Sequence, residues 1–147
     1  MKTKWKITIG AGLALLAMGA GGVAFIIYSS LEVVHDSYAQ WDAALSIIYH
    51  MRTHAGAWPK DWEALHEACL SAPDLRGPGW DNLRERVDVD FSADPHLLSQ
   101  AEFPKDGPPF KVVWLRNGKR HHWSGGEPNR LILEYLKSRN TKQPTGG

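Results

Sequence analysis

The stretch LEVVHDSYAQWDAALSII, residues 31–48, decides the fold, because its large apolar residues recur at alternating intervals of three and four. This spacing forms a heptad stripe on one side of an α-helix. No proline or glycine interrupts residues 29–55, so the sequence predicts one amphipathic helix over that range. The stripe, which we expect to be an interaction surface, consists of Leu31, Val34, Tyr38, Trp41, Leu45 and Ile48.

The stripe needs an apolar partner, which is either the rest of the same chain or a second copy. Coiled-coil dimers usually have more heptads and fewer aromatic residues. We therefore prefer the interpretation in which the stripe packs against the chain's own domain.

An uncharged segment precedes this helix. Residues 7–28, ITIGAGLALLAMGAGGVAFIIY, form a run of 22 residues without a charge. As a helix, such a run spans roughly 33 Å, which is enough to cross the hydrocarbon core of a bilayer. The positive-inside rule places residues 1–6 in the cytoplasm and everything after Tyr28 outside. The charges behind this orientation are lysines before the segment and acids after it: Lys2, Lys4, Lys6, Glu32 and Asp36.

A cleaved signal peptide is the alternative for this segment. Ala17-Met18-Gly19 offers a small-x-small cleavage site after an apolar region at residues 7–16. Residues 23–28 stay apolar beyond that site, which a mature N-terminus would not need. We therefore prefer an uncleaved transmembrane helix over residues 7–28.

Two histidines close the amphipathic helix. His50 and His54 lie four residues apart, so they are neighbours on the helix surface and could ligate a metal ion. Met51 stands where a His-Glu-x-x-His motif has its glutamate, and no third ligand follows at a fixed spacing. We expect solvated side chains near a helix C-terminus, where positive charge is favourable, and we expect no cofactor.

The helix end has a recognisable pattern. Gly56 supplies a left-handed residue, and Trp58-Pro59 begins a second, short helix in which Pro59 occupies the first turn. The inward side of that helix is predicted to carry Trp62, Leu65 and Cys69.

This layout resembles the pilin-like subunits of type IV pili and type II secretion. The residues that carry the resemblance are Tyr49, Gly56, Trp58, Pro59 and Leu65. The resemblance implies a membrane-anchored subunit whose domain assembles with other subunits. The leader-peptidase site of that family, a glycine followed by an aromatic residue and soon by a glutamate, is absent, since the first acid is Glu32.

The second half of the chain alternates strand and helix signals. Residues 86–91 are predicted to be a strand. Asp94-Pro95 is an N-cap and first turn that begins a short helix ending at Gln100. Glu127-Pro128 begins a C-terminal helix, with the acid at the positive end of its dipole. We expect residues 141–147 to be disordered.

Asn117-Gly118 predicts a two-residue type I′ hairpin within FKVVWLRNGKRHHW, residues 110–123. The register pairs Trp114 with His121, so Phe110, Val112 and Trp114 are expected to cover the helices while Val113 and Leu115 face away. Basic residues crowd the predicted tip, and they are candidates for contact with an envelope polyanion: Arg116, Lys119 and Arg120.

The charge distribution favours contacts within the fold. The whole chain has a net charge of +1. Residues 31–104 carry 13 acids and 5 bases, whereas residues 105–147 carry 3 acids and 9 bases. An acidic segment beside a basic one indicates that the two meet within the domain or across a subunit boundary. An exported domain rarely meets nucleic acid, so no nucleic-acid partner is expected.

No catalytic set holds together. The one cysteine, Cys69, is paired by spacing only with His66, and no phosphate loop or dinucleotide fingerprint is present. The sequence therefore predicts a single-pass membrane protein with a non-catalytic, extracytoplasmic interaction or assembly domain over residues 56–140. The alternatives are a histidine-dependent metal module and an envelope-polyanion-binding module. The expected fold is α+β, with the long helix packed on a small antiparallel sheet and short helices, and the expected partners are the bilayer and either a second copy or an envelope protein.

Overall fold

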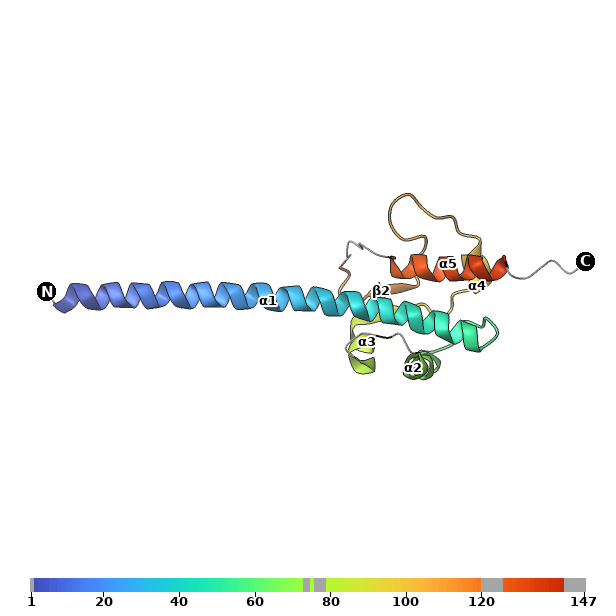
Figure 1. The fold of residues 1–147 in the computed structure, drawn as a ribbon, viewed down its shortest axis with the longest axis horizontal. Helices are drawn as coiled ribbons and strands as arrows, with labels where there is room; N and C mark the ends of the chain where they lie inside the picture. The colour runs from blue at the N-terminus through green and yellow to red at the C-terminus, as the bar shows by residue number, and fades with distance from the viewer. Residues whose placement is uncertain (1, 73–74, 76–78, 120–125, 142–147) are drawn as a thin grey trace, which may run out of the picture. The chain divides into compact units, whose positions relative to one another are not determined.

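The computed structural model describes residues 2–72, 75, 79–119 and 126–141, and for residues 2–21 and 24 it describes the backbone alone. The chain divides into two compact units, residues 1–34 and 35–147, and the helix α1 belongs to both. Helices and a small antiparallel sheet alternate along the second unit, which confirms the α+β class. The elements, shown in Figure 1, are α1 (Lys2–Thr53), α2 (Trp62–Ser71), α3 (Trp80–Arg86), β1 (Val87–Val89), α4 (Pro95–Ser99), β2 (Val113–Leu115) and α5 (Pro128–Asn140).

The predicted long helix is present, and it runs to Thr53 without a break. Within the residues that were described, no helix combines the length and apolar character needed to cross a bilayer. Most of the predicted span at 7–28 falls on residues whose side chains lie outside the described set.

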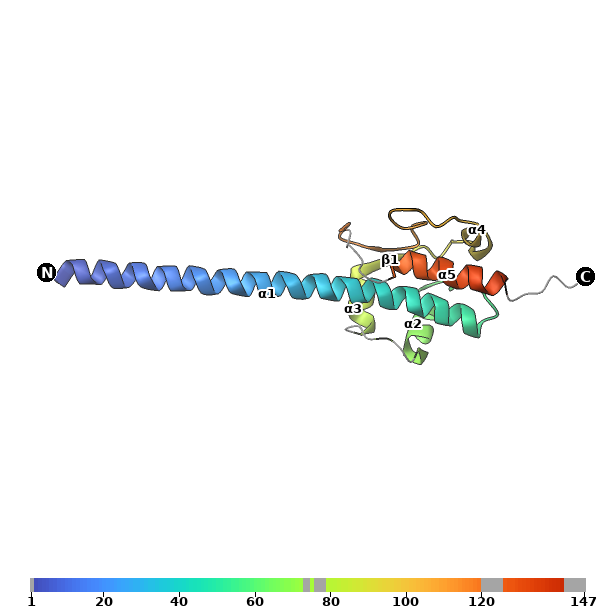
Figure 2. The same ribbon diagram turned by 45° about the horizontal axis from the view of Figure 1, so that its top comes forward.

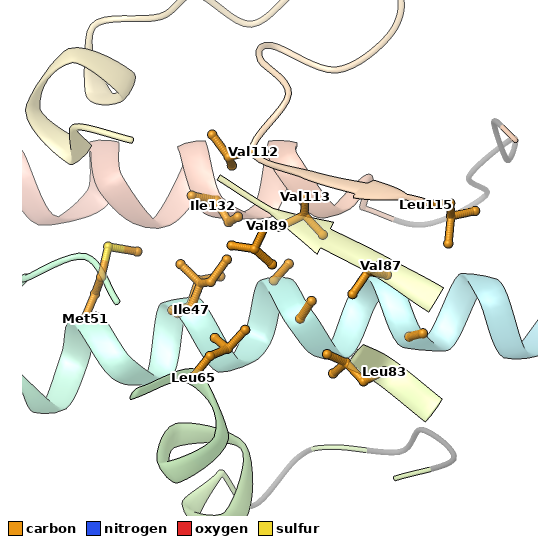
Figure 3. Close-up of a cluster of buried hydrophobic side chains, with 14 of the residues drawn as sticks. Ile47, Met51, Leu65, Leu83, Val87, Val89, Val112, Val113, Leu115 and Ile132 are labelled. Atoms are coloured by element: carbon orange, nitrogen blue, oxygen red, sulfur yellow. The ribbon is translucent and has the colours of Figure 1, made fainter. Parts of the chain in front are cut away.

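The core of the second unit forms where α1, α2, α5 and the two strands meet. Figures 1 and 2 both show α5 lying alongside the C-terminal part of α1. Ile47 and Met51 of α1 point into a cluster with Leu65 of α2 and Ile132 of α5, as Figure 3 shows. Each fully buried aliphatic side chain of this kind contributes roughly 1.5–3 kcal/mol to folding.

The sheet pairs strands from distant parts of the sequence. β1 and β2 are antiparallel, with Val87 opposite Leu115 and Val89 opposite Val113. These four side chains are buried, so the predicted orientation of residues 113–115 is wrong: Val113 and Leu115 face the core, and Trp114 is half-buried on the other side. The prediction failed because it derived the register from a hairpin with residues 119–123, whereas β2 pairs with β1. Before the strand, Val112 is buried in the core and Phe110 packs against it, as predicted. The predicted second arm of the hairpin, residues 120–123, lies outside the described residues.

The turn after β2 also differs from the prediction. The backbone N–H of Gly118 donates to the carbonyl of Leu115 at 3.1 Å, so the turn begins one residue earlier than expected. Gly118 has a φ of +71°, but Asn117 does not adopt a positive φ, which a type I′ turn requires. The Asn117 side chain is instead committed to the fold, because its Nδ2 donates to Asp36 Oδ2 at 2.9 Å.

The local capping signals gave correct predictions. Asp94 and Glu127 cap α4 and α5 as predicted, with a proline at the start of each helix. Gly56 has the expected left-handed φ of +91° after α1. The predicted start of α2 is wrong: Asp61 is its N-cap, and Pro59 lies before the helix, where it is fully buried.

Buried polar side chains fix the elements to one another. Asn129 of α5 accepts hydrogen bonds from the N–H groups of Val112 and Val113 at 2.9 Å each, and it donates to the Val113 carbonyl at 3.0 Å. Gln40 of α1 donates to the same carbonyl at 3.1 Å. β2 is thereby tied to both long helices through side chains that the sequence pattern did not single out.

Candidate functional site

The face of α1 that packs on its own domain is lined by alanines. Ala39, Ala43 and Ala44 are completely buried, and Ile47 and Met51 continue the same side of the helix toward its end. Small side chains allow the strands and the neighbouring helices to approach the backbone of α1 closely. The domain therefore packs against this alanine face, which we name from Ala39, Ala43 and Ala44.

The heptad stripe is a different face of α1, and three of its six residues are exposed. In the second unit, Tyr38 is 44 % exposed, Trp41 and Leu45 are half-buried, and Ile48 is buried. In the first unit, Leu31 and Val34 are 50 % and 45 % exposed. Within the second unit, the stripe therefore runs from a buried residue, Ile48, which lies in the core, to an exposed one, Tyr38.

The C-terminal half of the stripe lines a groove between α1 and α5. The groove has a volume of about 490 Å³. The next heptad position after Ile48 is Arg52, which also lines it, so the groove continues the face that begins at Tyr38. The lining residues are Leu45, Ile48, Tyr49, Arg52, Ala72, Leu75, Leu131, Glu134, Tyr135 and Ser138.

The groove has an apolar floor and a charged rim. On the α1 side the guanidinium of Arg52 lies 5.4 Å from the centre of the Tyr135 ring. On the α5 side Glu134 accepts a 3.4 Å contact from Arg130 Nε, between two side chains that are about half exposed. Exposed ion pairs are worth less than about 1 kcal/mol, so this rim can rearrange around a bound side chain at small cost. The arrangement suits an apolar helix face with polar flanks.

The histidine pair is a stacked contact. The rings of His50 and His54 are nearly parallel, at 10°, with centroids 4.0 Å apart. Imidazole binds metals through lone pairs in the plane of the ring. Parallel planes share no point near the rings, so one ion cannot take in-plane lone pairs from both. Among the residues that are described, no group of three or more histidine, cysteine, aspartate or glutamate side chains could hold a metal ion.

His50 is not solvated, in contrast to the prediction. Only 7 % of the residue is exposed, because α2 covers this side of α1, whereas His54 is exposed as predicted. Burial lowers the pKa of His50, and the neighbouring charge of His54 lowers it further. A backbone hydrogen bond with Ala64 and the nearby acids Glu67 and Asp61 act in the opposite direction.

The cysteine has no catalytic environment. Burial raises the pKa of the Cys69 thiol, which reduces the thiolate that a nucleophile needs, although a hydrogen bond with Ser46 partly offsets this. His66 stacks on Trp80 with ring centroids 4.4 Å apart. The imidazole of His66 therefore packs on Trp80, and no contact between it and the Cys69 thiol is found among the described residues.

The predicted basic tip is only partly available to a polyanion. Arg116 Nε lies 2.9 Å from Asp88 Oδ1 and donates to the Val87 carbonyl at 3.1 Å. Lys119 is exposed, and Arg120 lies outside the described residues. The Arg116–Asp88 pair is also one place where the basic and acidic segments of the sequence meet.

No protein family, curated protein or solved structure matches this chain. The five residues of the pilin-like resemblance lie at the α1–α2 corner and beside it. Tyr49 lines the groove, and Leu65 is buried in the core. The indole N–H of Trp58 donates to the Asp90 carbonyl at 2.9 Å, which ties the corner to the end of β1.

Proposed function

We propose that this chain is a single-pass membrane protein whose extracytoplasmic α+β domain assembles with a second copy of itself through the heptad stripe, in the manner of a pilin-like subunit. The observation that carries the proposal is the division of α1 into two faces. The alanine face is buried in the domain, while Tyr38 at the open end of the stripe remains 44 % exposed.

A second copy is the partner that best fits the stripe. Heptad spacing is the pattern by which two parallel helices interlock. Two copies anchored in one membrane with the same orientation would present their stripes in parallel. Since Tyr38 stays exposed within the second unit, intermolecular packing is the alternative that we prefer for the stripe.

Support for the anchor comes from the helix that precedes the stripe. Residues 7–28 carry no charge, and successive residues of a helix point in directions about 100° apart. Phe25, Ile26, Ile27 and Tyr28 are between 56 % and 72 % exposed, so large apolar side chains surround this part of the helix on all sides. Lipid tails would cover such a surface.

The anchor is tested by membrane fractionation of the full chain. Wild type should stay in the membrane pellet after an alkaline carbonate wash, and external protease should remove the domain from intact spheroplasts. Replacing Leu15 and Leu16 by arginine should release the chain, since each central arginine costs roughly 2.5–3.5 kcal/mol of insertion. A wild-type chain in the soluble fraction, or a domain protected from external protease, would contradict the anchor.

Assembly is tested by measuring the molecular mass of the full chain in lipid nanodiscs. Wild type should form a dimer or a larger species, and Tyr38→Glu should be monomeric, because a carboxylate would be buried in the interface. Glu63→Lys on α2 is the matched control, since it changes the charge of another exposed position and should leave assembly intact. A monomeric wild type, or a Tyr38→Glu variant that assembles normally, would refute self-assembly through the stripe.

A further inference from the structure

We propose that the His50–His54 stack is a pH-sensitive latch, which holds α2 against α1 while His50 is neutral and releases α2 in acid. This property is independent of the assembly surface. The latch lies on the side of α1 that faces α2, whereas the stripe and the groove lie on the sides that face solvent and α5.

The geometry of His50 provides the trigger. The backbone of Ala64 in α2 acts on this ring in the direction that raises the pKa of His50. Its Nδ1 is buried and has no hydrogen-bond partner within the part of the chain that is described. A second proton therefore has to enter at a nitrogen with neither an acceptor nor solvent beside it. A buried charged donor without an acceptor is strongly unfavourable, so the ring can keep the proton only by moving toward water.

Movement of His50 would disturb the packing of α2. The ring is covered on one face by His54 and contacts α2 at Ala64. Ala64, Leu65 and Ala68 are the buried residues of α2, so the residue that touches His50 belongs to the apolar contact that holds α2 in place.

The charged groups that face His50 affect how readily it takes up a proton. His54 lies on α1, and its ring Nδ1 is already 3.0 Å from the His50 carbonyl and 2.9 Å from Thr53 Oγ1. When both rings carry protons, two like charges lie face to face at 4.0 Å.

Two acids oppose this repulsion: Asp61, which precedes α2, and Glu67, within α2. Neither carboxylate forms a hydrogen bond with Nδ1 of His50. Burial and the charge of His54 outweigh these two acids and the Ala64 backbone, since the pKa of His50 is lowered overall. The balance favours release on acidification.

The test is hydrogen exchange by mass spectrometry on the full chain in detergent micelles between pH 7.5 and 5. Rates in residues 62–71 are divided by rates in α5 of the same sample, which removes the intrinsic pH dependence of exchange. The relative opening of α2 should increase as the pH falls, by at most about tenfold per pH unit for one linked proton. His50→Gln cannot take up the proton, so its ratio should stay flat.

Three further variants keep the proposal falsifiable if His50→Gln does not fold. His54→Gln should retain acid opening at a smaller amplitude, because the like charge is gone while the burial of His50 remains. His66→Gln removes the histidine of α2 itself and should behave as wild type, as should His96→Gln on the exposed side of α4. A flat wild-type ratio, or acid opening that disappears in His66→Gln and persists in His50→Gln, would overturn the latch.

Discussion

At the scale of single residues, Gly56 combines two constraints at the end of α1. Its φ of +91° is one that side chains with a Cβ rarely adopt, and a Cβ added there would overlap the guanidinium of Arg139. Arg139 occupies this space because its Nη2 donates to the Ala55 carbonyl. Gly56, which follows the end of α1, thus also leaves the space that the Arg139 side chain of α5 occupies.

Gly56→Ala should therefore destabilise the domain by the roughly 1–2 kcal/mol of left-handed strain plus the small cost of moving the Arg139 guanidinium away from the Ala55 carbonyl. Urea unfolding followed by circular dichroism measures the change. Gly118→Ala is the matched control, since Gly118 has a φ of +71° and a methyl group added there would meet nothing within 4 Å, so it should show the strain alone. When Arg139→Ala is added to Gly56→Ala, the cost of the glycine substitution should approach the cost of Gly118→Ala. Equal costs for Gly56→Ala and Gly118→Ala in the unmodified background would contradict the steric account.

Asp36 joins three elements through one buried carboxylate. Its carboxylate is buried and lies 2.7 Å from Arg86 Nη1 and 2.9 Å from Asn117 Nδ2, so it joins α1 to α3 and to the turn after β2. The sequence pattern presented Asp36 only as an acid after the apolar segment. Its partners are distant in the sequence: Arg86 lies 50 positions further along the chain and Asn117 lies 81 positions further. Local spacing cannot reveal such pairs.

Asp36→Ala should cost about 3–5 kcal/mol, because it leaves the guanidinium of Arg86 partly buried without this carboxylate. Asp88→Ala is the comparison: both side chains of the Arg116–Asp88 pair are about 40 % exposed, and its loss should cost less than about 1 kcal/mol. Chemical unfolding of both variants measures the difference. Similar costs would show that Asp36 does not join these elements as described.

At the scale of elements, α1 shows why periodicity found the helix but misassigned its inner face. The apolar spacing of residues 31–48 predicts a helix correctly, since one side of it is apolar. It does not say which side meets the domain, because Ala39, Ala43 and Ala44 are too small to stand out beside Tyr38 and Trp41. The domain packs closely on α1, so the side that it covers carries small side chains.

Ala43→Leu tests this assignment directly. Because Ala43 is completely buried in the domain, added volume there should destabilise by about 1–3 kcal/mol. Tyr38→Ala on the exposed stripe should change the stability of the isolated monomer by less than about 0.5 kcal/mol. Thermal unfolding in detergent at a dilution that keeps the chain monomeric provides both values, and a larger loss for Tyr38→Ala would reverse the assignment of the two faces.

The capping residues were predictable, whereas the strand partner was not. Asp94 and Glu127 bind N–H groups two or three residues away, so their signals are local. β2 pairs with a strand that ends 24 residues before it begins, and the Asn117-Gly118 signal carries no information about that distance. Asn129 was missed for the same reason, since its acceptor role depends on where Val112 and Val113 arrive.

At the scale of the whole molecule, His50 and Cys69 contribute to the pH dependence of stability from opposite sides. The folded-state pKa of His50 lies below its ordinary value of 6.5, so its contribution is present above that value and is lost as the pH falls. The folded-state pKa of Cys69 lies above its ordinary value of 9.0, so its contribution is present below that value and is lost as the pH rises. Stability should therefore be greatest between the two.

Urea midpoints measured from pH 5 to pH 10 test this profile. Each group can change stability by at most about 1.4 kcal/mol per pH unit. His50→Gln should reduce the loss on the acid side only, and Cys69→Ala should reduce the loss on the alkaline side only. A profile that neither variant alters would show that other groups govern the pH dependence.

The central claim is that α1 presents its heptad stripe to a second copy while its alanine face stays within the domain. Disulfide formation in native membranes tests it most directly, with single cysteines introduced into a Cys69→Ala chain. Cysteines at Tyr38, Trp41 and Leu45 should form disulfide-linked dimers under mild oxidation, and cysteines at Ala39, Ala43 and Ala44 should not. Dimers that form equally at both sets, or mainly at the alanine positions, would contradict the account.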